Sequence, residues 1–160
     1  MKSTLICCLI ILSFIGLFSC SQKPDVDVEK AKVKDTVDNF GKFWETEDTV
    51  LLSEMFVHDP NMVNYGAEEN EVFVGWNALR DSLTKILPAF DQTKVTIRNQ
   101  IIHVSDSGDA AWFSEIMDWN LLYEGKPALL PNQRLTGVLE KKNGKWVIVQ
   151  FHNSAPGTPH

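Results

Sequence analysis

Three side chains in the second half of the sequence have the residue types that proton transfer needs. His152 lies in the last predicted strand, and a neutral imidazole accepts or donates a proton near physiological pH. Asp118 lies in mid-strand between Ile116 and Trp119, where burial is expected to raise the pKa of an unpaired carboxyl. Arg134 can orient a carboxylate or polarise a carbonyl. Together they predict general acid–base catalysis, with His152 or Asp118 as base and Arg134 as electrophile.

Each of these three side chains also fits a purely structural role. His152 fits a buried histidine that is hydrogen-bonded to Ser154 or to a helix terminus. Arg134 fits an ion pair with Glu140 or Asp118 at the rim of a sheet. Asp118 fits the carboxylate of a salt bridge to Arg134. Both interpretations stay open, because the sequence alone does not say which side chains meet in space.

Other catalytic classes lack their sequence signatures. The four histidines include no HxH or HExxH spacing, so we predict no metal site. The chain has no Gly-x-Ser-x-Gly motif and no glycine-rich phosphate loop, which argues against serine hydrolase and phosphate-binding chemistry. The three cysteines, Cys7, Cys8 and Cys20, belong to the N-terminal leader and its end, so thiol catalysis and disulfides are not expected. We predict no cofactor.

The first 19 residues predict a signal peptide. Their apolar run, from Leu5 to Phe18, is shorter than the roughly 20 residues that a membrane span needs. The residues Leu17-Phe18-Ser19-Cys20 resemble the lipobox of bacterial lipoproteins, which implies cleavage before Cys20 and acylation of its thiol by fatty acids such as palmitate. We therefore expect a lipoprotein of the cell envelope, anchored in a membrane with its domain on the periplasmic or cell-surface side. Residues 20–26 would form the tether.

The charge of the mature chain argues against nucleic acid as a partner. Removal of Lys2 with the leader reduces the 15 basic residues to 14, and these face 21 acidic residues, for a net charge of −7. Such a surface repels phosphate backbones. The remaining partner classes are a small-molecule ligand, the lipid of the anchor and a second copy of the chain.

Hydrophobic periodicity predicts one α+β domain over residues 27–156, followed by a short tail, 157–160. An apolar stripe at Val33, Val37, Phe40 and Trp44 indicates a long N-terminal helix, and two shorter helices are expected at 49–55 and 76–87. After Pro88 the period changes to the alternation of strands. The expected strands cover 62–65, 71–74, 94–104, 110–123, 133–141 and 145–154. Helices followed by an antiparallel meander define the α+β class.

The turn at Asn143-Gly144 decides which side chains share a sheet face. A two-residue turn places Arg134 opposite Asn153, whereas a three-residue loop with a glycine bulge places Arg134 opposite His152. We favour the bulged loop, because it separates a dry face from a mixed face. The mixed face then gathers Arg134, Trp146, His152 and Ser154. Both faces of the sheet carry large apolar groups, which predicts a homodimer.

The order of elements, the pair Phe43-Trp44 followed by Asp48, and the final strand from Trp146 to Ser154 resemble the nuclear transport factor 2-like superfamily, specifically its SnoaL-like branch. The resemblance covers residues 27–156. It implies a cone-shaped curved antiparallel sheet packed on a long N-terminal helix and two shorter helices, with a pocket at the open end and dimers through the sheet. It also implies that Tyr65 and Trp76 lie near the mouth of the pocket.

The superfamily includes polyketide cyclases, ketosteroid isomerases, dehydratases and members that only bind, so the fold does not fix the function. The isomerases have a base Asp near the end of the first strand, where this chain has Asn64, which cannot take a proton. We favour a lipid-anchored module that binds a small, partly apolar ligand. The alternatives are a cofactor-free isomerase, cyclase or dehydratase, and a structural accessory protein that dimerises through its sheet. The ligand-binding residues predicted to line the pocket are Tyr65, Trp76, Arg134, Trp146, His152 and Ser154.

Overall fold

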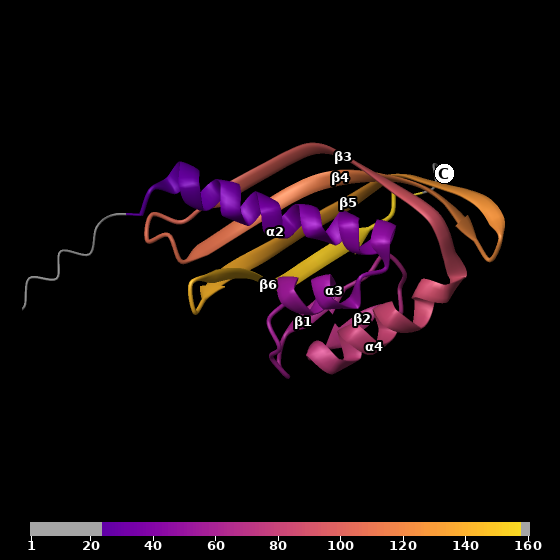
Figure 1. The fold of residues 1–160 in the computed structure, drawn as a ribbon, viewed down its shortest axis with the longest axis horizontal. Coiled ribbons are helices and arrows are strands. Elements are labelled where there is room, and N and C mark those ends of the chain that lie inside the picture. The colour runs from indigo at the N-terminus through magenta and orange to yellow at the C-terminus, as the bar shows by residue number, and fades with distance from the viewer. Residues whose placement is uncertain (1–23, 158–160) are drawn as a thin grey trace, which may run out of the picture.

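The computed structural model describes residues 24–157. The predicted signal peptide, the lipidation site at Cys20 and residues 158–160 lie outside this range. Within it, three α-helices and a short 3-10 helix precede or interrupt six strands (Figure 1). The helices are α2 (Val26–Thr46), α3 (Thr49–Met55), α4 (Trp76–Ile86) and η2 (Leu87–Ala89); the strands are β1 (Val63–Tyr65), β2 (Val72–Val74), β3 (Phe90–Val104), β4 (Ala110–Tyr123), β5 (Lys126–Lys142) and β6 (Lys145–Ser154). Within residues 24–157, no helix is long and apolar enough to span a membrane.

The helices begin and end where local chemistry requires. Asp25 caps α2, its side chain accepting from the backbone N–H groups of Asp27 and Val28, and Asp48 caps α3 in the same way. The buried stripe of α2 contains the four predicted positions together with Phe43. At the end of α4, Pro88 lies in the 3-10 turn that leads into β3. The three predicted helices are therefore confirmed.

The six strands form one curved, unclosed sheet in the order β2-β1-β6-β5-β4-β3. All neighbouring strands are antiparallel except β1 and β6, which pair in parallel at Tyr65 and His152. The sheet is therefore mixed, with one parallel contact added to the predicted antiparallel meander. β5 begins at Lys126, before the predicted start at residue 133, so β4 and β5 form a long hairpin.

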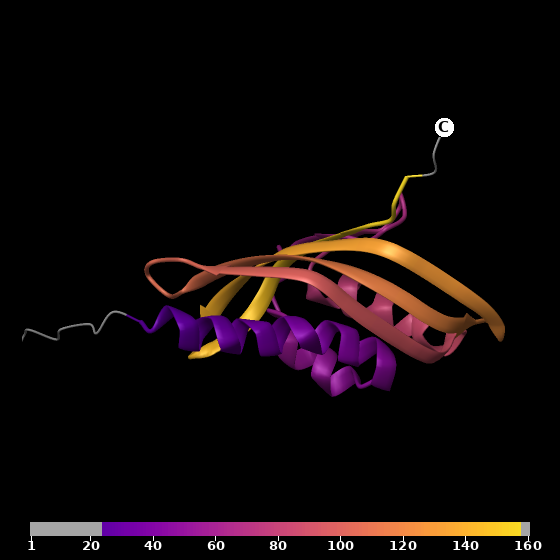
Figure 2. The same ribbon diagram turned by 90° about the horizontal axis from the view of Figure 1, so that it is seen from above.

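The helices of the described range lie on the concave side of the sheet (Figure 2). The core between them contains Phe43 and Leu52 from the helices and Met117, Leu135 and Phe151 from the strands, all fully or nearly fully buried. The convex side remains open and exposes Ile101, Trp112 and Val138. The enclosed side of the sheet is thus the side that carries Leu135 and Phe151.

The predicted register of the last hairpin is wrong. Lys142 pairs with Lys145, so Asn143 and Gly144 form a two-residue turn, and both have the positive φ that such a turn requires. The register then shifts further along the strands, where Val138 pairs with Gln150 but Leu139 pairs with Ile148. The additional residue, Val149, forms the bulge.

This bulge decides the facing of β6. Trp146, Ile148 and Phe151 are all buried on the helix side, which strict alternation would not permit, since residues 148 and 151 are three positions apart. Beyond the bulge, Arg134 pairs with Ser154 and Thr136 pairs with His152. Arg134 and His152 therefore share a face, but it is the convex face. Trp146 is on the opposite one.

Candidate functional site

A cavity of about 390 Å³ lies between the concave face of the sheet, the C-terminal half of α2 and the end of α4. We call it the cone cavity. Its lining residues come from both helices, from the β1–β2 loop and from the strands β2 to β6: Phe40, Trp44, Gly66, Ala67, Glu68, Glu71, Phe73, Ser82, Leu83, Ile86, Phe90, Trp119, Leu121, Tyr123, Ala128, Leu130, Gln133, Phe151 and Asn153.

Aromatic rings form most of the buried wall of the cone cavity. Trp44 contacts Trp119 edge-on, with ring centroids 5.2 Å apart, and lies 5.1 Å from Phe90. Tyr123 packs edge-on against Phe90 at 5.5 Å. Trp44 and Trp119 are buried, whereas Tyr123 is exposed, so the tryptophans lie at the floor and Tyr123 at the rim. Such a wall suits a ring system or another bulky apolar group.

Several polar groups of the lining lack a partner. The indole nitrogens of Trp44 and Trp119 are buried donors with no acceptor within residues 24–157, and the amide oxygen of Asn153 is a buried acceptor with no donor there. Gln133 adds another buried polar side chain to the lining, 7% exposed. Because buried polar groups are nearly always hydrogen-bonded, unpaired groups around a cavity point to a ligand or water that completes them.

The β1–β2 loop supplies the carboxylates of the rim. The backbone N–H of Glu68 donates to the side chain of Glu71 at 3.0 Å, and the backbone N–H of Gly66 donates to the carbonyl oxygen of Glu71 at 2.8 Å. A side chain at Gly66 would collide with the Glu71 carboxylate, so glycine is needed at this close approach. Among the described residues, the lining contains no Lys, Arg, His or Asp. Its titratable groups are Glu68, Glu71 and Tyr123.

The predicted grouping of polar residues in the pocket is wrong. Arg134 is exposed on the convex face and donates to the carbonyl oxygen of Ala155 at 3.2 Å. His152 is exposed on the same face, so it is also not the buried histidine of the structural alternative, and its ring lies 5.8 Å from that of Tyr65. Ser154 is opposite Arg134. These side chains lie outside the cone cavity because the apolar face of β5 and β6 packs against the helices.

Asp118 has a different partner and a different pKa from those expected. Its oxygens accept from Arg98, at 2.5 Å from Nε and 3.0 Å from Nη2, and from the backbone N–H of Asn132 at 2.8 Å. These bonds, chiefly those from Arg98, lower the pKa of Asp118 to about 2. The predicted increase in its pKa is therefore wrong, as is its predicted pairing with Arg134. Asp118 does not line the cone cavity.

The two predicted tryptophans are buried but also lie outside the lining. Trp76 begins α4 and stacks on His58, with centroids 4.4 Å apart. Trp146 donates its indole N–H to Glu29 at 2.7 Å. Tyr65 is 45% exposed on the convex side beside His152. None of the six residues predicted to bind the ligand lines the cone cavity.

Two polar residues of β5 and β6 that line the cone cavity are each one position away in the sequence from a residue predicted to line it. Gln133 precedes Arg134, and Asn153 follows His152, so each has the opposite facing. The sequence signal for this facing was the apolar pair Leu135 and Phe151, whose side chains are buried against the helices. Residues that share its facing, including Gln133 and Asn153, would then have been the candidates.

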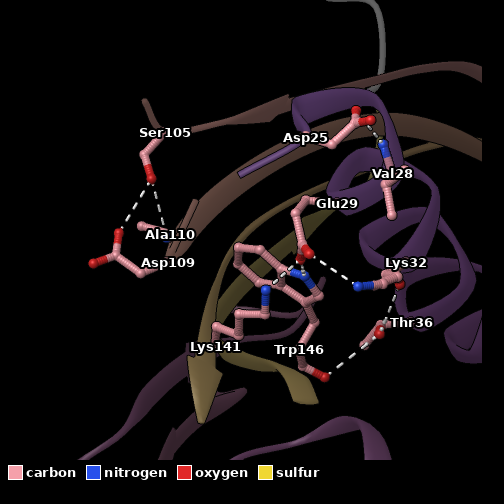
Figure 3. A network of polar contacts seen from close by, with 10 residues as sticks. All are labelled: Asp25, Val28, Glu29, Lys32, Thr36, Ser105, Asp109, Ala110, Lys141 and Trp146. Atoms are coloured by element: carbon pink, nitrogen blue, oxygen red, sulfur yellow. Dashed lines mark hydrogen bonds and ion pairs between the residues drawn. The ribbon is translucent and has the colours of Figure 1, made fainter. Parts of the chain in front are cut away.

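Two buried carboxyls lie outside the cone cavity. Glu29, in the first turn of α2, accepts from Lys32 at 2.9 Å, Lys141 at 2.7 Å and Trp146 at 2.7 Å (Figure 3). Hydrogen bonds from Lys141 and then Lys32 are the main causes that lower the pKa of Glu29 to about 2. This network fastens the start of α2 to the β5–β6 hairpin.

Glu115 is the second buried carboxyl, 3% exposed beneath α2. Gln100 bridges it to Asp38, donating to Glu115 at 2.8 Å and to Asp38 at 2.9 Å. Burial raises the pKa of Glu115 to about 7, and the negative charge of Asp38 acts in the same direction. The other oxygen of Glu115 has no partner within the described residues.

No group of three metal-ligating side chains is present among residues 24–157.

Comparisons with known proteins identify relatives of this fold. A family model described as a SnoaL-like domain matches residues 33–158. A nuclear transport factor 2-like superfamily protein from Salmonella enterica superposes with a TM-score of 0.73 at 18% identity, covering 84% of this chain and 95% of that one. A candidate dehydratase of the NTF2-like family from Streptomyces avermitilis gives 0.73 at 15% identity, covering 82% and 99%.

A third similar structure is a candidate scytalone dehydratase from Novosphingobium aromaticivorans. Its TM-score is 0.70 at 16% identity, and the alignment covers 82% of this chain and 87% of that one. At these identities the likeness concerns the fold. No curated protein matches the sequence.

Proposed function

The chain belongs to the SnoaL-like family, and we propose that it binds a small, partly apolar molecule in the cone cavity while a lipid anchor holds it on a membrane. The observation that carries the binding proposal is the unpaired polar atoms of Trp44, Trp119 and Asn153, within the described chain, beside an otherwise aromatic cavity. A volume of about 390 Å³ lies within the range of small-molecule sites.

Binding explains the lining better than catalysis does. The predicted acid–base residues His152, Asp118 and Arg134 are all absent from the lining, and Asp118 is neutralised by Arg98. A cofactor-free isomerase, cyclase or dehydratase would have to use Glu68, Glu71 or Tyr123, which lie at the rim. The candidate dehydratases among the similar structures keep this class as the alternative, and product formation from a bound ligand would establish it.

A homodimer through the convex face is part of the proposal. This face has an open groove of about 520 Å³, the outer groove, whose walls include the exposed side chains of Ile101, Trp112 and Val138. A sheet face of this kind is stabilised by a second copy of the same face. The structural accessory function would use this face alone and leave the cone cavity without a ligand.

The lipid anchor at Cys20 would hold the domain with its cone cavity away from the membrane. Pro24 packs against Gly108 in the β3–β4 turn, at the end of the molecule where α2 begins. The cone cavity lies toward the other end, where α2 ends and the β4–β5 turn lies (Figure 1). The tether would thus leave the domain at the end remote from the cavity, and the ligand would enter from the aqueous side.

The binding proposal is tested by filling the cone cavity. Ala128, on β5, lines the cavity and is only partly buried, so Ala128→Trp should occupy the space that a ligand needs. A thermal-shift screen with hydrophobic acids, sterols, aromatic lactones and aromatic amines should give ligands that stabilise the native protein but not Ala128→Trp. The matched control, His152→Ala on the convex face, should keep the full shift.

Equal ligand-induced thermal shifts in the wild type and Ala128→Trp would show that the ligand binds outside the cone cavity, which would contradict the proposal. The anchor is tested separately with Cys20→Ser, which should move the protein from the membrane fraction to the soluble fraction of expressing cells. Retention of Cys20→Ser in the membrane fraction would contradict acylation at this position.

A further inference from the structure

Resting on the proposed binding function, we infer that the ligand of the cone cavity is an amphipathic organic cation. It would place an aromatic or alicyclic skeleton against the floor and a protonated amine at the rim. The proposal combines the charge of the lining, the unpaired groups of the floor and the arrangement of the rim.

The lining is electrostatically one-sided. Among the described residues it contains two carboxylates, Glu68 and Glu71, and no basic side chain. Neither carboxylate forms an ion pair with a side chain of residues 24–157, although six other ion pairs occur there. An organic anion in the cavity would face these charges without compensation. A cation would meet both of them, and the excess of negative charge over the mature chain favours its approach.

The floor favours an uncharged ring that carries a hydrogen-bonding group. Trp44 and Trp119 are each 7% exposed, and their indole N–H groups lack an acceptor in the described chain. Asn153 offers an acceptor that lacks a donor in the same range. A hydroxyl group on the ligand would supply the missing partner of one of these groups, while the ring packs on Phe40 and Phe151, which line the cavity.

The rim is suited to the charged end of such a molecule. Tyr123 and Leu130 are partly exposed there, and Tyr123 stands edge-on to Phe90. A cation near an aromatic face is stabilised by the ring quadrupole, and Glu68 and Glu71 add direct charge attraction. Since the rim is open to water, each of these effects is modest, and together they predict a preference of about three- to tenfold over the uncharged analogue.

The test uses three probes with one skeleton and different charges: 2-naphthylmethylamine, 2-naphthylmethanol and 2-naphthoate. Quenching of tryptophan fluorescence that persists in the Trp112→Phe background reports binding in the cone cavity, because Trp44 and Trp119 form its floor whereas Trp112 lines the outer groove. Near neutral pH the amine should bind about three to ten times more tightly than the alcohol, and the carboxylate most weakly. Raising the salt concentration to about 0.5 M should weaken the amine alone.

The double variant Glu68→Gln/Glu71→Gln separates charge from shape. Both substitutions keep the size of the native side chains, and the amide oxygen introduced at position 71 can still accept from the backbone N–H of residue 68. The variant should bind the amine and the alcohol equally, with the affinity for the alcohol unchanged. The matched control Glu124→Gln, on the exposed β4–β5 turn, should keep the preference for the amine.

The outcomes distinguish the two proposals. If the alcohol binds but the amine binds no more tightly, or if the carboxylate binds best, the inferred charge is wrong while the binding function stands. If the double variant keeps the preference for the amine, the carboxylates are not its origin and the inference fails. If none of the probes quenches the wild type, the cone cavity is not a binding site for ring compounds, and both proposals fail together.

Discussion

The buried carboxyl of Glu115 gives a prediction whose size follows from the structure. Its side chain is 3% exposed and has one donor within the described residues, Gln100, which it shares with Asp38. Lys34 pairs with Asp38 and acts weakly against the increase in pKa. The folded protein therefore binds a proton at Glu115 up to about pH 7, whereas a free glutamate releases it near pH 4.5.

The sign of the effect follows from linkage. Because the folded pKa lies above the unfolded one, protonation of Glu115 favours the folded state. As pH rises above 4.5, ionisation of this carboxyl stabilises the unfolded chain, and the stability of the fold falls. The fall ends when the folded carboxyl also ionises, near pH 7. A shift of this size corresponds to about 3 kcal/mol of stability that is present below pH 4.5 and absent above pH 7.

Glu115→Gln removes this titration. The free energy of unfolding of the variant minus that of the wild type should rise by about 3 kcal/mol between about pH 4 and about pH 8. The new amide N–H replaces the unpartnered oxygen, and its desolvation costs about 1–3 kcal/mol at every pH, so it cancels from the difference. The contributions of Glu29 and Asp118, whose pKa values are lowered, are common to both proteins and cancel as well.

Urea denaturation followed by fluorescence at these two pH values measures this quantity. Glu124→Gln, at an exposed turn position, is the control for loss of a carboxylate and should show the same difference from the wild type at both pH values. A difference between Glu115→Gln and the wild type that does not change with pH would refute the buried, protonated carboxyl.

Three further predictions concern other parts of the molecule. Glu29→Gln should reduce the free energy of unfolding by about 1–3 kcal/mol at neutral pH, because Lys141 and Trp146 lose a charged acceptor. The pKa of Glu29 is lowered, so the stability that its carboxylate contributes is fully present above pH 4.5 and is lost as pH falls through about 2. Urea unfolding at neutral pH and near the lowered pKa should show a smaller difference between variant and wild type at the lower pH. Gly137→Ala should destabilise the protein by about 1–3 kcal/mol, since its Cβ would lie 2.6 Å from Phe113 and 2.7 Å from the carbonyl oxygen of Gln150, while Gly157→Ala, which meets no atom within 4 Å, should leave the melting temperature unchanged. Arg134→Ala should leave ligand affinity within about twofold of the wild type, because its side chain is on the convex face. A larger loss of affinity, measured by ligand titration, would show that Arg134 belongs to the binding site.

The local elements of this fold were determined by the sequence. The stripe of α2 recurs at positions three or four apart, and Asp25 and Asp48 each stand just before a helix whose first N–H groups they cap. Alternation after Pro88 predicted the strands, and Asn143-Gly144 marked the last hairpin. These signals act between near neighbours in the chain, so they can be read without knowledge of the tertiary structure. They were sufficient for the α+β class and the family resemblance.

The candidate site was decided by contacts between distant residues. The carboxylate of Asp118 is paired by Arg98 from the neighbouring strand, which no pattern around residue 118 indicates. The bulge at Val149 allows Trp146, Ile148 and Phe151 to be buried together, and its position depends on how all three pack beneath α2 and α3.

Which face of the sheet the helices cover then determines the lining of the cone cavity. Because facing alternates at every residue, this single choice exchanged Arg134 and His152 for their neighbours Gln133 and Asn153. The sequence specified which residues alternate, but the side that becomes enclosed was set by the burial of the largest apolar area, a property of the assembled sheet and helices.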